Sequence, residues 1–101
     1  MAVHEIVALA RQILAREIDP IEGCRAIVRH QRTLAGRARR LPALLLIVAI
    51  EAETDHLPTA ETRASFGPLQ LREKDRWRAD YLTRHEPVLR DACKELVEHL
   101  A

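Results

Sequence analysis

The sequence of 101 residues has few of the residues that a turn-rich or disulfide-stapled fold requires. It contains three aromatic residues, three glycines and two cysteines, while alanine, leucine, arginine and glutamate are abundant. Scarce glycine and aromatic residues argue against a β fold, and the abundant residue types are strong helix formers. The two cysteines form no CxxC pair, which argues against a zinc knuckle and against a dithiol redox motif.

Long apolar runs are also missing. The longest, LPALLLIVAI at residues 41–50, is too short to cross a bilayer, which takes about 20 residues. The N-terminus, MAVHEIVALARQ, lacks the basic start and continuous apolar segment of a signal peptide. We therefore expect a cytoplasmic bacterial protein without a membrane partner, in which Cys24 and Cys93 are buried reduced thiols.

Neither sign of charge dominates, but the two signs are separated along the chain. Residues 21–43 carry six arginines and one glutamate, whereas residues 44–62 carry four acids and no lysine or arginine. The net charge is only +1, and a hydrophobic fraction of 48% is sufficient for a folded core. The length is that of one domain, so we expect residues 1–101 to form a single helical domain.

The spacing of apolar residues predicts an all-α fold, a compact bundle of four to five helices. The expected helices cover residues 3–18, 20 to 34 or 35, 43–56, 69–86 and 87–100. Asp19-Pro20 separates the first two helices, which should form an αα-hairpin, and Pro87 breaks or kinks the last part of the chain. Residues 43–56 are apolar on every side at their centre, so they should be buried on most faces as a central helix. The composition of residues 44–50 also suits a strand, but a lone strand would leave its backbone groups unpaired.

The octapeptide EAETDHLP, residues 51–58, is the first candidate site because it places three acids and a histidine within six residues. On a helix Glu51 and Asp55 share one face, and Glu53 and His56 share another. Glu-x-x-His is half of a di-iron carboxylate motif, which makes a metal-dependent enzyme using Glu53 and His56 one hypothesis. No other glutamate precedes a histidine by three residues, and no nucleophile, oxyanion loop or phosphate-binding glycines are apparent. We favour a structural role for the acids, paired with arginines of the basic segment, and next an interaction surface.

A second candidate is the basic stripe of Arg25, Arg29 and Arg32, at positions i, i+4 and i+7 of the second helix. Such arginines bind carboxylate-rich surfaces or phosphates, or pair with acids of their own chain. Trp77, four residues before Tyr81, is either an interface anchor or part of the core. We expect no cofactor and no catalytic residues, because the sequence contains no recognisable catalytic motif.

Two segments, ARQILAREIDPIEGCRAIV at 10–28 and ETDHLP at 53–58, together with a final helix like DACKELVEHL, resemble a group of small uncharacterised bacterial proteins that share a domain of unknown function. The most specific words of the resemblance are IEGCR and ETDHLP. No activity is implied by it, so no catalytic residue carries over. Pro87 departs from the single long final helix that the resemblance implies.

These observations predict a non-catalytic protein-interaction domain, such as an inhibitor, an immunity-type protein or a regulatory adaptor. Its protein partner is expected to be acidic, because charge segregation suits electrostatically complementary docking. A nucleic-acid binder that uses the Arg25, Arg29 and Arg32 stripe is the alternative. A homodimer is a further option, and the sequence does not identify the partner.

Overall fold

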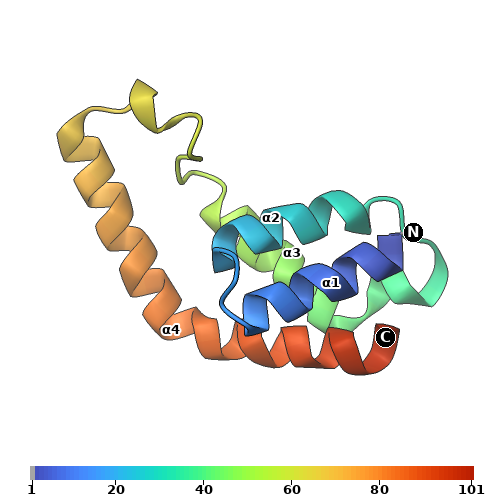
Figure 1. The fold of residues 1–101 in the computed structure, drawn as a ribbon. Coiled ribbons are helices and arrows are strands. Elements are labelled where there is room, and N and C mark those ends of the chain that lie inside the picture. The colour runs from blue at the N-terminus through green and yellow to red at the C-terminus, as the bar shows by residue number, and fades with distance from the viewer. Residues whose placement is uncertain (1) are drawn as a thin grey trace.

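The computed structural model describes residues 2–101 and has an all-α fold, as the sequence predicts (Figure 1). Its elements, in order, are α1 (Ala2–Leu14), α2 (Pro20–Gln31), the 3-10 helix η1 (Gly36–Arg40), α3 (Pro42–Thr54), the 3-10 helix η2 (Arg63–Ser65) and α4 (Pro68–Leu100). Within these residues there are four α-helices and no strand, so the strand alternative for residues 44–50 is wrong.

The four helices form a ring in which each packs against two others. α1 and α3 both lie against α2 and α4, so the apolar stripes of all four meet in one core. Fully buried side chains from every helix fill it, among them Ile6, Ile27, Leu44, Ile47 and Leu96. α1 and α2 are consecutive and packed together, which confirms the αα-hairpin.

Local chemistry sets the start of α2 as predicted. Asp19 accepts a hydrogen bond from the backbone N–H of Glu22 at 2.9 Å, and Pro20 occupies the first turn, where its missing N–H costs nothing. The end of α1 comes four residues earlier than expected, at Leu14. Arg16 there adopts a left-handed backbone, with φ at 59°, which ends the helix and turns the chain toward α2.

α2 also ends early, at Gln31. The backbone N–H and the hydroxyl of Thr33 both bond back to the carbonyl of His30, at 3.1 and 2.8 Å. These contacts form a tight turn in place of another helical turn. Gly36, with φ at +67°, then begins η1, a 3-10 helix in a segment that none of the expected helices covers.

α3 is not a central helix surrounded on most sides. Its buried residues, Ala43, Leu44, Ile47, Ile50 and Thr54, form one face. Leu45 on the opposite side is 53% exposed, and Ala49 and Ala52 are exposed as well. The expectation was wrong because α3 occupies one corner of a four-helix ring, where α2, α4 and η1 contact it and its outer side stays open.

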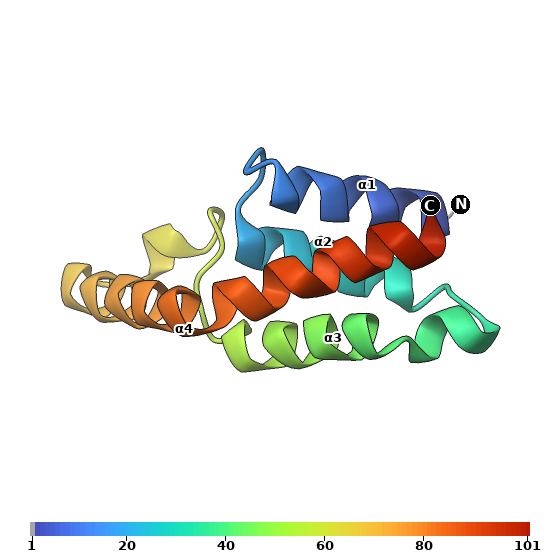
Figure 2. The same ribbon diagram turned by 90° about the horizontal axis from the view of Figure 1, so that it is seen from below.

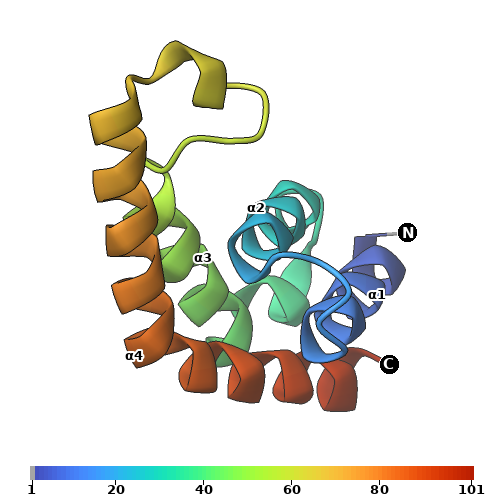
Figure 3. The same cartoon turned by 60° about the vertical axis from the view of Figure 1, so that its left-hand side comes forward.

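α4 is one helix of 33 residues rather than two helices separated at Pro87. Figures 1 and 3 show that it bends sharply, so that its first half leaves the bundle while its second half closes the ring. Pro87 has no N–H to give to the carbonyl of Thr83, and its ring crowds that carbonyl, which explains a kink in the turn before the proline. The first half of α4 and the loop that follows α3 thus form an arm beside the bundle.

Candidate functional site

Arg25 belongs to α2, and its side chain lies against the C-terminal end of α3 rather than on an open surface. Its side chain is 11% exposed. Its Nη2 donates to the carbonyls of Thr54 and Leu57, at 3.1 and 2.9 Å, and its Nη1 donates to Glu22 Oε1 at 2.6 Å. The last carbonyls of a helix lack partners within the helix and carry the negative end of its dipole, so a guanidinium there stabilises the helix end.

This contact corrects the expected salt bridges between the basic segment and the acids of EAETDHLP. Among residues 2–101, no arginine from that segment forms an ion pair with Glu51, Glu53 or Asp55. Arg25 instead donates to the backbone of the same octapeptide. The carbonyls at the end of α3 have no partner within the helix and need a donor, whereas water can solvate the exposed carboxylates.

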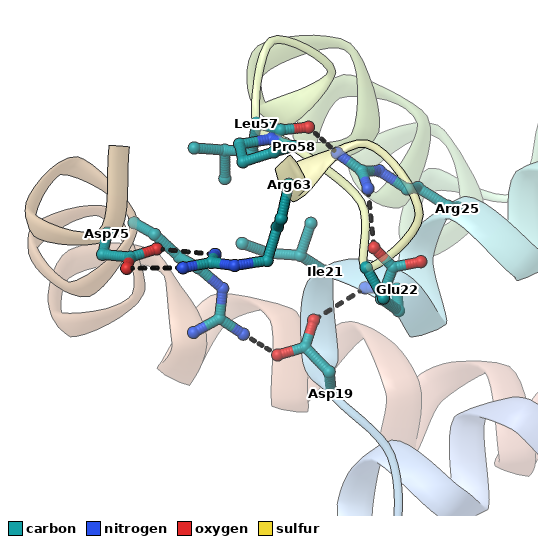
Figure 4. A pocket seen from close by; sticks show the side chains of 10 residues that line it. Asp19, Ile21, Glu22, Arg25, Leu57, Pro58, Arg63 and Asp75 are labelled. Atoms are coloured by element: carbon teal, nitrogen blue, oxygen red, sulfur yellow. Dashed lines mark hydrogen bonds and ion pairs between the residues drawn. The ribbon is translucent and has the colours of Figure 1, made fainter. Parts of the chain in front are cut away.

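A pocket of about 340 Å³ opens beside Arg25, between the start of α2, the loop that follows α3, and α4 (Figure 4). Two further ion pairs cross it. Arg63 donates to both carboxylate oxygens of Asp75, each at 3.0 Å, and Arg78 pairs with Asp19. The hydrogen bonds from Arg63 lower the pKa of Asp75. Every charged side chain that lines the pocket is already paired, so a ligand would have to displace a salt bridge.

The candidate pair Glu53 and His56 does not converge on one point. Glu53 accepts a hydrogen bond from Tyr81 Oη at 3.3 Å, while His56 Nδ1 lies 2.9 Å from Lys74 Nζ. A hydrogen bond between these two atoms requires Nδ1 of His56 as the acceptor, because an ammonium only donates. Within residues 2–101, no group of three or more His, Cys, Asp or Glu side chains is arranged to hold a metal ion.

The other two acids of the octapeptide have no such partners. Asp55 is exposed and Glu51 is half-buried. In the described part of the chain, neither forms a hydrogen bond or an ion pair through its carboxylate. They remain available at the surface near the end of α3.

A row of rings lines the inner side of the first half of α4. Trp77 stacks on Tyr81 with centroids 4.9 Å apart, and Tyr81 stacks on His85 at 4.2 Å. His56 meets Trp77 edge-on at 4.3 Å, which ties the end of α3 to the arm. Tyr81 is buried, and its burial, followed by the nearby charge of Glu53, raises the pKa of its phenol to about 12. Trp77 packs against the core rather than standing free as an anchor.

An exposed basic surface lies at the end of α2 and along η1. It consists of five exposed arginines without an ion pair or hydrogen bond within the part of the chain that the structure describes: Arg29, Arg32, Arg37, Arg39 and Arg40. We call these five residues the arginine surface. Arg37, Arg39 and Arg40 also line a shallow pocket of about 510 Å³. The predicted stripe therefore loses Arg25 and continues into η1 instead.

The structure shows two contacts that sequence reasoning missed. Arg90 donates to the carbonyl of Leu14 at 2.9 Å and so covers the end of α1, as Arg25 covers the end of α3. No local signal could reveal it, since its partner lies 76 residues away. His85 did have a signal, because it follows Tyr81 by one helical turn, as Tyr81 follows Trp77.

Cys24 and Cys93 are both buried free thiols, as predicted. Burial raises the pKa of Cys24 to about 12 and that of Cys93 to about 11. The charge of a Cys93 thiolate is a second and smaller cause of the raised pKa of Cys24. They behave as core side chains and not as nucleophiles.

Comparisons of this chain with protein-family models, with curated proteins and with solved structures find no match. The resemblance carried by IEGCR and ETDHLP therefore stays a prediction. Among residues 2–101, no helix is long and apolar enough to cross a membrane.

Proposed function

We propose that this chain is a non-catalytic bacterial protein-interaction domain that binds an acidic partner protein through the arginine surface. The observation that carries the proposal is the difference between two sets of arginines. Arg16, Arg25, Arg63, Arg78 and Arg90 are engaged within the fold. In contrast, the arginine surface concentrates five unengaged guanidinium groups within twelve residues that contain no acid.

Unpaired guanidinium groups favour a carboxylate-rich partner for a physical reason. Each presents a planar fork of donors that matches a carboxylate, and clustered positive charge accelerates the encounter with a negative surface. An inhibitor that masks another protein, an immunity-type protein or a regulatory adaptor would all use such a surface. The cytoplasmic setting expected from the sequence is part of the same proposal.

Nucleic acid is the less favoured partner because the arginine surface lacks stacking groups. The aromatic side chains of the chain are Phe66, Trp77 and Tyr81, none of which lies between residues 29 and 40. Trp77 and Tyr81 are stacked in the ring row of α4. Proteins that bind single strands usually interleave basic and aromatic residues, and a net charge of +1 gives little long-range attraction to a duplex.

The test is capture from native bacterial lysate, read by mass spectrometry, with and without nuclease and across a salt series. The informative variant is Arg29→Gln/Arg32→Gln/Arg39→Gln. Its matched control, Arg11→Gln/Arg72→Gln/Arg76→Gln, removes the same charge from exposed arginines that have no partner in the described residues. We expect a discrete acidic protein that resists nuclease, is retained by the control and is lost with the first variant.

Two outcomes would contradict the proposal. If both triple variants retain the same proteins as the wild type, the arginine surface is not a docking site. If the captured material is nucleic acid that disappears with nuclease or moderate salt, the surface binds phosphates and the nucleic-acid alternative takes its place.

A further inference from the structure

The outer side of α3 is apolar but uncovered. Residues 43–50 are all apolar, and a helix of that composition is normally buried on every side. Here Leu45 is 53% exposed, and Val88 on the neighbouring helix α4 is 47% exposed. Pro42, Leu46 and Val88 line a groove of about 190 Å³ between the two helices. Hydrophobic area of this kind, grouped on one side of the molecule, is typical of an interface.

The groove belongs to a broader strip. Figure 2 shows α3 and the second half of α4 side by side, running in opposite directions. Together they present what we call the α3/α4 face: Pro42, Leu45, Leu46, Ala49 and Val88. Small Ala49, one turn from Leu45, leaves room for a facing helix to approach closely.

The charges along α4 make this face complementary to a second copy of itself. Asp91 and Glu95 follow Val88 at helical spacing and line the groove with it, and Arg84 lies one turn before Val88, at the bend of α4. Arg84, Asp91 and Glu95 are exposed, and none has an ion pair within residues 2–101. Between Arg84 and Glu95 this part of α4 is thus basic at one end, apolar at Val88 and acidic at the other end.

A two-fold axis that crosses α4 at Val88, next to the bend, sets the second half of this helix antiparallel to that of its copy. Val88 then faces Val88 of the second copy, and Arg84 of each copy faces Asp91 and Glu95 of the other. The same rotation lays α3 antiparallel on its copy and covers Leu45. A two-fold interface requires such self-complementarity, because the same surface serves both partners.

We infer that the α3/α4 face is a contact surface between two copies of this chain. The arginine surface lies on α2 and η1, outside this face, so a dimer would present two of them to partners. The inference therefore stands independently of the proposed function.

Sedimentation velocity across a dilution series tests the inference. The mass is expected to rise with concentration toward twice the 11.5 kDa of the single chain. Leu45→Gln/Val88→Gln should keep the mass of one chain at every concentration, with unchanged helical circular dichroism. Leu69→Gln is the control, because Leu69 is 70% exposed at the start of α4, away from the face, and this variant should dimerise as the wild type does.

A charge exchange separates this dimer from any other. Arg84→Glu alone and Asp91→Arg/Glu95→Arg alone should each weaken dimerisation, since like charges then face each other. The combination of all three substitutions should restore it. A wild-type chain that stays monomeric at every concentration would overturn the inference. So would a dimer that is insensitive to Leu45→Gln/Val88→Gln, or one that the combined exchange fails to restore.

Discussion

Arg25→Met tests whether this arginine is a helix cap or a binding residue. Methionine keeps most of the apolar stem but removes the donors to the carbonyls of Thr54 and Leu57. Hydrogen bonds to charged groups contribute about 1.5–3 kcal/mol each, and an acceptor left without a partner costs about as much. The ion pair with Glu22, whose side chain is 49% exposed, adds little. In the variant, water can solvate one of the two carbonyls, which lowers the cost. We therefore expect the free energy of unfolding to fall by about 2–4 kcal/mol in total.

The assay is urea unfolding followed by circular dichroism, together with a thermal melt. A domain of this size has a stability of about 5–15 kcal/mol, so the loss is a large part of the total. It corresponds to a fall of about 10–25 °C in the melting temperature. Arg29→Met is the matched control on the same helix, since Arg29 is exposed and forms no ion pair or hydrogen bond in the described residues, and it should change stability by at most about 0.5 kcal/mol.

The reasoning fails if the two variants unfold at the same denaturant concentration. It fails equally if Arg25→Met abolishes partner capture while its unfolding free energy is unchanged, because Arg25 would then be a binding residue and not a cap.

Three further predictions follow from burial. Gly23→Ala should destabilise the protein in urea, because the new Cβ would lie 2.6 Å from Ile13 side-chain atoms, and overpacking of about 1–3 kcal/mol exceeds the gain of about 1 kcal/mol in helix propensity. Gly67→Ala is the control, because its Cβ meets nothing closer than 3.7 Å, and it should cost only about 0.5 kcal/mol, since alanine is a poorer N-cap than glycine. Burial raises the pKa of Tyr81 from 10.0 to about 12, so the phenol ionises first in the unfolded chain and the unfolding free energy falls as pH rises above 10. Tyr81→Phe should make that fall shallower. Equal slopes for the two proteins would count against the burial of the phenol. Burial raises the thiol pKa of Cys24 to about 12 and that of Cys93 to about 11, so both should react with a thiol reagent only after unfolding. Prompt labelling of the native protein would show instead that the thiols are accessible.

Sequence reasoning succeeded where the determining chemistry is local. Asp19 and Pro20 start α2 through contacts within four residues, so their effect is visible in the sequence itself. The buried stripes of α1 and α2 follow from the spacing of apolar residues, and the αα-hairpin follows from the Asp19-Pro20 corner between the two helices. Helix ends were less predictable. The left-handed backbone that ends α1 belongs to Arg16, whereas a glycine at that position would have indicated the helix end in the sequence.

The candidate site could be predicted only in part, because its contacts join distant parts of the chain. Arg25 finds its acceptors 29 and 32 residues away, and its spacing with Arg29 and Arg32 wrongly suggested a shared surface role. Glu53 and His56 have the spacing of a metal motif, yet the arm of α4 engages them separately. In each case the deciding partner belongs to another helix, which spacing within one helix does not reveal.

The bend of α4 has a consequence for how the molecule opens. The second half of the helix closes the four-helix ring, whereas the first half is held by side-chain contacts to the end of α3 and to the start of α2. At Pro87 the backbone ladder is missing one bond, so the two halves are not locked together by a continuous set of hydrogen bonds. We therefore expect the arm to open as a unit of its own before the bundle does, and amide hydrogen exchange should then be faster in the first half of α4 than in its second half.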